Sequence, residues 1–196
     1  INGVADLTLT TNAYLLPQKA NILKKAGLQR VTISLDSLDD SIFKQMNGRG
    51  FGTERVLQGI KAAEDAGLTP IKINCVVQKG VNDHTLVDLA RFFKNSGHIV
   101  RFIEYMDVGN RNRWELDQVV PAEEIINIIN ASMPLEPIPN SYRGEVASRY
   151  RYRDGGGEMG VIASVTKPFC GDCTRLRLSP EGSIYTCLFA NNGKDL

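Results

Sequence analysis

The 196-residue sequence lacks several features that mark large protein classes. Its net charge is only +1, which argues against a general nucleic-acid or membrane-surface binder. No apolar run approaches the roughly 20 residues that a membrane-spanning helix needs. Cysteine occurs four times, and this sparse usage is typical of an intracellular protein with reduced thiols rather than a disulfide scaffold. What remains is an ordinary globular composition, with 42% hydrophobic and 23% charged residues.

Short apolar strands alternate with helices over the first half of the chain. Strands are predicted at residues 6–11, 30–36, 71–78 and 100–106, and helices at residues 17–25, 41–46, 53–66 and 84–95. This alternation predicts an α/β fold with a parallel sheet whose functional residues gather at the carboxyl ends of the strands. We place a domain boundary after residue 107, so that residues 1–107 and 108–196 form two units.

The second half reads differently. A helix is predicted at residues 121–131, and a proline-rich connection at 132–141. Strands at 145–153 and 159–165 are expected to form a hairpin around Gly155–Gly157. The letters from Gly155 to Gly160 match a dinucleotide-binding pattern, but that pattern needs a helix after it, and a strand follows here.

Three of the four cysteines form a compact motif near the end of the chain. Cys170, Cys173 and Cys187 follow a C-x2-C-x13-C spacing, and a hairpin is predicted between the second and the third. Three thiolates suit an iron–sulfur cluster with one open iron. A zinc site completed by His84, His98 or an aspartate is the main alternative, and a disulfide is a weaker one. Cys75 lies apart and is expected to be a buried strand residue.

Basic residues lie close to this motif in sequence. Arg175 and Arg177 alternate, so they should share one face of a strand beside the cysteines, where guanidinium groups suit an anion. Lys72 is a charged residue within an apolar strand and points either to the edge or into a site. Arg149, Arg151 and Arg153 alternate, so they should share one strand face. A solvated face is expected, and pairing with a phosphate-bearing substrate is the lesser alternative.

Five motifs in order resemble one known family. They are Leu9–Asn12, Val31–Leu38, Met46–Gly48, Val100–Asp107, and Phe169–Leu178 with Cys187 downstream. This order resembles the GTP 3′,8-cyclases of molybdenum cofactor biosynthesis, which are radical S-adenosylmethionine enzymes. The resemblance runs through essentially the whole chain.

The resemblance implies the fold, the cofactors and the site residues. It implies a partial (β/α) barrel with four of six strands present, followed by a β-rich segment with a hairpin that bears the cysteines. Its site residues fall into three groups: Cys170, Cys173 and Cys187 for a [4Fe-4S] cluster; Lys72, Arg175 and Arg177 for GTP; and Thr11, Ser34 and Met106 for S-adenosylmethionine. It also implies a cytoplasmic protein, or a mitochondrial one in a eukaryote. Its expected partners are GTP, a downstream pterin-forming enzyme and, as an open option, a second copy.

The sequence also departs from the family. The C-x3-C-x2-C motif of the family's first cluster does not occur, so we expect a fragment that is inactive alone. Two rival functions stay open. One is a zinc-stabilised binding module, and the other is a different radical enzyme that uses an auxiliary C-terminal cluster on a peptide substrate.

Overall fold

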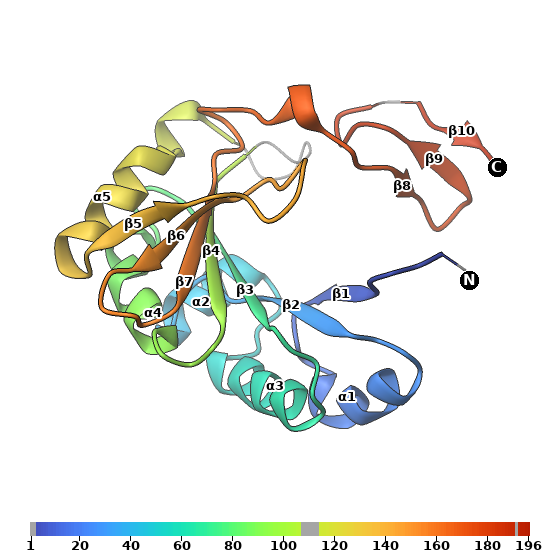
Figure 1. The fold of residues 1–196 in the computed structure, drawn as a ribbon, viewed down its shortest axis with the longest axis horizontal. Helices are drawn as coiled ribbons and strands as arrows, with labels where there is room; N and C mark the ends of the chain where they lie inside the picture. Colours follow the sequence, from blue (N-terminus) through green and yellow to red (C-terminus); the bar gives the residue numbers. More distant parts are fainter. Residues whose placement is uncertain (1–2, 107–113, 191) are drawn as a thin grey trace.

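The computed structural model describes residues 3–106, 114–190 and 192–196, and it contains one large sheet and one small one (Figure 1). The large sheet has seven strands in the order β1-β2-β3-β4-β7-β6-β5. Their bounds are β1 (Thr8–Thr11), β2 (Arg30–Ser34), β3 (Lys72–Val77), β4 (Ile99–Glu104), β5 (Leu135–Ile138), β6 (Ser148–Tyr152) and β7 (Glu158–Ile162). Strands β1 to β4 run parallel, which confirms the predicted parallel sheet.

In the part of the chain that the structure describes, five α-helices accompany this sheet. They are α1 (Leu16–Lys25), α2 (Asp40–Asn47), α3 (Thr53–Asp65), α4 (Leu86–Phe93) and α5 (Ala122–Ser132), and each lies within a few residues of its prediction. The start of α2 shows why the prediction succeeded. Asp39 caps the helix by accepting hydrogen bonds from the backbone N–H groups of Ser41 (2.8 Å) and Ile42 (3.1 Å).

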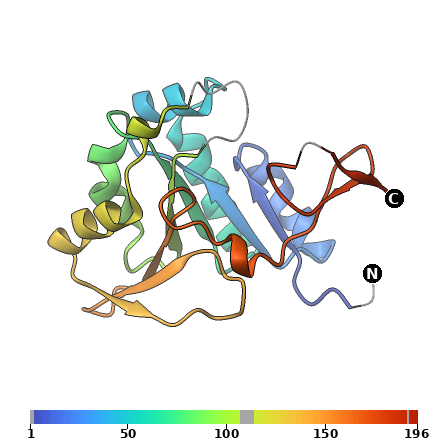
Figure 2. The same cartoon turned by 90° about the horizontal axis from the view of Figure 1, so that it is seen from above.

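The two faces of the large sheet differ in character. Along β3, Ile73, Cys75 and Val77 are fully buried, whereas Lys72 and Asn74 on the opposite face are half-buried. Cys75 is therefore the buried strand residue that the sequence predicted. Figure 2 shows helices gathered on one side of the strands, with the C-terminal segment on the other. The face away from the helices is the polar one, and it carries Lys72 and Asn74.

One prediction about the second half was wrong. Residues 132–141 were expected to be a connection, but they contain β5, which pairs antiparallel with β6. Proline normally disfavours a strand because it lacks the backbone N–H that the ladder needs. Pro137 is tolerated because β5 is the edge strand of the sheet, where one side of the backbone has no neighbouring strand.

The predicted hairpin between β6 and β7 is confirmed. The two strands are antiparallel, and the glycine-rich segment connects them. Gly155 (φ +82°) and Gly157 (φ +100°) adopt the left-handed backbone conformation that favours glycine. Strand β7 also pairs in parallel with β4, so the hairpin extends the sheet formed by the first half of the chain.

A separate three-stranded antiparallel sheet follows at the C-terminal end. It is built from β8 (Arg177–Leu178), β9 (Ser183–Tyr185) and β10 (Lys194–Asp195). Figure 1 shows it to one side of the large sheet, above β1. The boundary that we expected after residue 107 lies outside the described residues. Within the described residues, every helix is too short or too polar to cross a membrane.

Candidate functional site

The three cysteines of the C-terminal motif line one cavity, which we call the cysteine cavity. Cys170 opens a 3₁₀ turn, η3 (Cys170–Asp172), Cys173 follows that turn, and Cys187 lies beyond β9. The volume of the cavity is about 250 Å³. Its lining also includes Arg175, Arg177, Met106 and the apolar residues Pro168, Phe169, Leu188 and Phe189. All three thiols belong to exposed residues and none is in a disulfide, so they are available as ligands.

Arg175 lies directly against one of these thiols. Its guanidinium donates to Cys173 Sγ from Nη2 (3.1 Å) and from Nε (3.3 Å), and it lies 4.6 Å from the centre of the Phe169 ring. The backbone N–H of Arg175, followed by its guanidinium, lowers the pKa of the Cys173 thiol from its ordinary value. A stabilised thiolate is the form that binds metal.

Arg177 shows an unsatisfied group at the same cavity. Its Nη1 atom is buried and has no hydrogen-bond partner among the described residues. Buried donors in proteins are almost always paired, so an orphaned guanidinium nitrogen indicates a missing acceptor. The geometry therefore favours an anionic or carbonyl-bearing ligand next to the cysteines.

The two candidate metal centres need different ligand geometries. Among the described residues, no three His, Cys, Asp or Glu side chains are grouped closely enough to hold one metal ion. Tetrahedral zinc with Zn–S bonds of ~2.3 Å would need sulfurs roughly 3.8 Å apart. A four-iron cluster takes each thiolate on a different iron, and its ligands therefore lie further apart.

Neither histidine supplies the fourth zinc ligand that the alternative needs. His98 is buried at the start of β4, and its Nε2 pairs with Glu64 Oε1 at 2.8 Å. His84 lies in the 3₁₀ turn η1 (Asp83–Thr85), beside Asp83. Neither residue lines the cysteine cavity.

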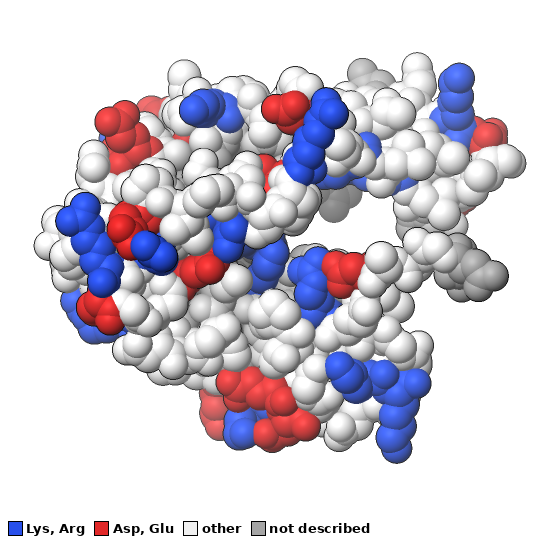
Figure 3. All heavy atoms as spheres, viewed as in Figure 1, with Lys and Arg blue, Asp and Glu red and all other residues white. Residues whose placement is uncertain are grey.

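A second cavity surrounds Lys72, and we call it the cationic cavity. It has a volume of about 390 Å³. Its basic lining residues are Arg30, Lys72, Arg101 and Arg149, and its acidic ones are Asp6 and Glu145. Figure 3 shows Lys and Arg side chains gathered beside the hollow between the large sheet and the C-terminal strands. Such a concentration of cations on a polar sheet face suits a polyanion.

Lys72 and Arg101 are influenced by the charge of Glu145 but pair directly with no described carboxylate. Neither takes part in an ion pair within the described residues, whereas Arg30 pairs with Asp6, and Arg149 with Glu158 at 2.7 Å. Burial, followed by the nearby charge of Arg101, lowers the pKa of Lys72. Burial likewise lowers the pKa of Arg101. These shifts mean that an anion in the cavity would relieve both groups.

Arg101 is a candidate that the sequence interpretation did not select. It lies beside Asn74 in the register of β3 and β4, and its Nε donates to Asn74 Oδ1 at 2.9 Å. The available signal was a charged residue within an apolar strand, the same signal that drew attention to Lys72. Arg149 was expected on a solvated face but lines the cavity, whereas Arg151 is exposed and pairs with Glu136.

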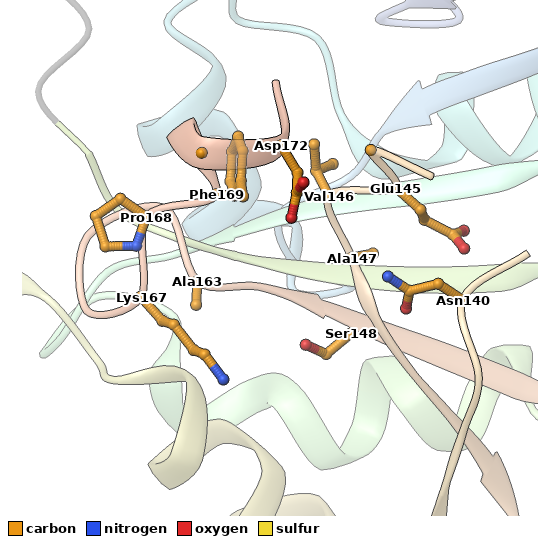
Figure 4. A pocket seen from close by; sticks show the side chains of 12 residues that line it. Asn140, Glu145, Val146, Ala147, Ser148, Ala163, Lys167, Pro168, Phe169 and Asp172 are labelled. Carbon is orange, nitrogen blue, oxygen red and sulfur yellow. The ribbon is translucent and has the colours of Figure 1, made fainter. Parts of the chain in front are cut away.

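A third cavity, which we call the linking cavity, shares lining residues with the other two. It has a volume of about 470 Å³ (Figure 4). It shares Glu145 and Ala147 with the cationic cavity, and Pro168 and Phe169 with the cysteine cavity. Lys72 and the pair Arg175 and Arg177 therefore line different cavities, and they do not converge on one point.

The residues expected to hold S-adenosylmethionine lie at the carboxyl ends of the parallel strands. Thr11 ends β1, Ser34 ends the neighbouring β2, and Met106 follows β4. Thr11 Oγ1 accepts a hydrogen bond from the backbone N–H of Ala13 at 3.1 Å. Met106 lines both the cysteine cavity and a cavity of about 540 Å³ at the strand ends. The structure thus places all three residues at one edge of the sheet.

Asp36 lines the same strand-end cavity. Its Oδ1 accepts a hydrogen bond from the backbone N–H of Val76 at 2.8 Å. Burial raises the pKa of Asp36 to about 6, and this effect exceeds the opposing effect of the Val76 hydrogen bond. The sequence interpretation placed Asp36 at the end of a predicted strand and within a family motif, without giving it a role.

Comparison with known proteins relates both halves of the chain to characterised families. Residues 98–196 match the Molybdenum Cofactor Synthesis C family, and residues 1–93 match the Radical SAM superfamily. A solved radical SAM methyltransferase from Sphaerobacter thermophilus overlaps 63% of this chain and 37% of its own, with a TM-score of 0.48 and 17% identity.

Curated proteins named GTP 3′,8-cyclase are similar to nearly the whole chain. A GTP 3′,8-cyclase from Acidothermus cellulolyticus is 55% identical over 98% of this chain and 53% of its own length. One from Xanthomonas campestris pv. campestris is 48% identical over 100% of this chain and 58% of its own. The chain thus spans little more than half the length of these relatives. It belongs to the Molybdenum Cofactor Synthesis C family, with a Radical SAM superfamily segment preceding the matched region.

Proposed function

We propose that this chain is the substrate-binding and second-cluster part of a GTP 3′,8-cyclase. Such an enzyme converts GTP to 3′,8-cyclo-7,8-dihydroguanosine 5′-triphosphate, the first step toward the molybdenum cofactor. The observation that carries the proposal is the cysteine cavity, where three thiols surround a space that also holds the unpaired Arg177 Nη1. The names of the relatives support the same reaction.

In this proposal the large sheet is part of a radical SAM barrel, and β8 and β9 form a hairpin beside the cluster. Cys170, Cys173 and Cys187 would hold a [4Fe-4S] cluster. When bound, this cluster would supply an iron with an open position for the purine. Thr11, Ser34 and Met106 would hold S-adenosylmethionine at the strand ends. Of the four cysteines in the chain, only the buried Cys75 remains outside this set. These residues alone therefore offer no second three-thiolate site, and we expect them not to cleave S-adenosylmethionine.

The position of the cations divides the GTP site into two parts. Lys72 and Arg101 would bind the triphosphate in the cationic cavity, and Arg175 and Arg177 would bind acceptor atoms near the guanine. Each charge-assisted hydrogen bond contributes roughly 1.5–3 kcal/mol. This arrangement refines the expectation from the sequence, which assigned Lys72, Arg175 and Arg177 to GTP without dividing them between its phosphates and its base.

Binding experiments on the cluster-loaded protein test this division. We expect Lys72→Ala to weaken GTP binding by about ten- to a hundredfold while leaving guanosine binding nearly unchanged, because guanosine carries no phosphates. Arg177→Ala should weaken both ligands, because both carry guanine. Arg153→Ala, which removes an exposed cation outside these cavities, is the matched control. If Lys72→Ala weakened the binding of GTP and guanosine equally, the triphosphate could not be assigned to the cationic cavity.

The zinc-module alternative predicts a different outcome for the metal. Anaerobic reconstitution should give about four irons per chain and a broad visible absorption, whereas a zinc module would retain one zinc, stay colourless and ignore GTP. A peptide-modifying radical enzyme would also bind iron, but it would not need Lys72 for its substrate. Assembly as a homodimer, transfer of the product to a pterin-forming enzyme and a cytoplasmic or mitochondrial location remain further parts of the proposal.

A further inference from the structure

One fully buried carboxylate ends strand β4 and lines the strand-end cavity. Glu104 is the last residue of β4, and its exposed fraction is 0%. A charged side chain is rarely buried so completely unless its oxygens are satisfied by several donors. None of the metal or substrate roles described above uses Glu104.

The carboxylate of Glu104 is fully engaged by backbone and hydroxyl donors. Its Oε1 accepts hydrogen bonds from the backbone N–H of Ala122 (2.7 Å) and from the hydroxyl of Thr166. Its Oε2 accepts from the backbone N–H groups of Val165 (2.7 Å) and Thr166 (2.8 Å). One side chain thus joins the end of β4, the first turn of α5 and the segment that follows β7.

Two of these elements, β4 and the segment after β7, carry the two parts of the proposed binding site. Strand β4 contributes Arg101 to the cationic cavity, three residues before Glu104. The segment held at Val165 and Thr166 continues directly to Pro168, which borders the cysteine cavity and the linking cavity. Among the described side chains of β4, Glu104 alone forms hydrogen bonds with residues 165–166.

We propose that Glu104 is a positioning residue that fixes the spacing between the cationic cavity and the cysteine cavity. This inference rests on the proposed function, because it requires one ligand that contacts both cavities. A ligand that binds two linked sites gains affinity only when the geometry allows both contacts at once. Loosening the link should therefore weaken a ligand that spans the cavities more than a ligand that occupies one of them.

Glu104→Gln breaks this link with little change in volume. An amide offers one oxygen and one NH₂ group, so one of the two former carboxylate positions becomes a donor that faces a backbone N–H. If the NH₂ group faces Val165 and Thr166, the C-terminal segment is released. If it faces Ala122, helix α5 is released instead. In the first orientation the bonds from β4 to residues 165–166 are lost, and in the second they are weakened, because a neutral amide oxygen is a poorer acceptor than a carboxylate.

The experiment compares three probes by anaerobic titration calorimetry on the cluster-loaded protein. The probes are GTP, guanosine and inorganic tripolyphosphate. We expect Glu104→Gln to weaken GTP by about tenfold, with guanosine and tripolyphosphate each changed less than about twofold. The matched control is Glu124→Gln, which removes an exposed carboxylate from the first turn of the same helix α5. It should leave all three affinities unchanged.

Each other result is decisive. Equal weakening of the binding of all three probes would indicate general damage to the fold and would overturn a positioning role. Unchanged GTP binding by a folded Glu104→Gln protein would also overturn that role. If Glu104→Gln does not fold, Thr166→Val takes its place, since it removes only the hydroxyl donor. Thr166→Val should weaken the binding of GTP alone by about threefold. Unchanged GTP affinity in Thr166→Val would overturn the proposal. If the wild-type protein binds GTP no more tightly than it binds guanosine or tripolyphosphate, this inference is overturned and the proposed function is not. Binding of none of the probes would overturn the proposed function itself.

Discussion

The two cavities proposed to hold GTP are built from very different material. The cationic cavity lies on the seven-stranded sheet, whose β3 and β4 bury Ile73, Cys75 and Phe102 completely on the helix-covered face. The cysteine cavity lies between a 3₁₀ turn and strands of two or three residues. A long, well-buried strand fixes side-chain positions more firmly than a short exposed one.

Exposure shows the same contrast. Around the small sheet, Leu176 and Phe189 are 66% and 61% exposed, although both are large apolar residues. Little apolar burial is therefore available to stabilise this part of the chain. We infer that the sheet side of the site is formed by folding, whereas the cysteine side depends on metal ligation for much of its order.

The largest expected effect follows from this dependence. Cys170→Ala should abolish cluster binding and leave residues 169–190 open to proteolysis, with the sheet intact, because a lost thiolate cannot be replaced from the described lining of the cavity. Cys75→Ala is the matched control, since Cys75 is buried in β3 and lies outside the cysteine cavity. Iron content, visible absorption and limited proteolysis measure the outcome. A Cys170→Ala protein with full iron content would contradict the assigned ligands.

The contrast between locally formed and tertiary structure also explains which elements could be predicted from the sequence. Strands such as β3 and helices such as α3 were predictable because their apolar residues recur at the spacing of a strand or a helix. That spacing can be recognised within the segment itself. Strand β5 was not predictable, because its proline is acceptable only at a sheet edge, and the edge is set by strands far away in the sequence.

The candidate site was predictable to a similar extent. The cysteines and the arginines beside them form one local motif, so their meeting in one cavity follows from the sequence. The position of Arg101 next to Asn74 depends on the pairing of β3 with β4, and the role of Glu104 depends on a segment about 60 residues later. Such contacts are set by tertiary structure and leave no local pattern.

A pH-dependent effect is expected on the sheet side. The pKa of Asp36 is about 6 in the folded protein and about 3.8 in the unfolded chain, so the folded state holds its proton to higher pH. Stability should therefore fall as pH rises from about 4 to 6, by up to roughly 3 kcal/mol, and stay lower above pH 6. Asp36→Asn removes this loss, because an amide stays neutral and can still accept the Val76 hydrogen bond.

Urea denaturation at several pH values measures this effect. At pH 7 Asp36→Asn should be more stable than the wild-type protein, and near pH 3.5 the two should be similar. Asp39→Asn changes an exposed carboxylate that caps α2 and serves as a control, because the pKa of Asp39 is lowered rather than raised, first by the Ser41 hydroxyl. Its stability difference should have the opposite pH dependence. A constant advantage of Asp36→Asn at all pH values would contradict a protonated Asp36.

The smallest expected effect concerns the edge of the cationic cavity. Asp6 pairs with Arg30, and both residues line that cavity. This ion pair is partly exposed, with 25% and 46% of the side chains of Arg30 and Asp6 accessible, so it contributes little to stability. It nevertheless holds Arg30 against a carboxylate that an incoming phosphate would have to replace.

Asp6→Asn should therefore tighten the binding of GTP and tripolyphosphate by about two- to threefold at low salt. Guanosine binding should stay unchanged, and the gain should diminish at high salt. Titration at two ionic strengths distinguishes this outcome from a change in the fold, which would affect guanosine as well. Weaker GTP binding by Asp6→Asn would mean that the Asp6–Arg30 pair shapes the cavity instead of competing with the substrate.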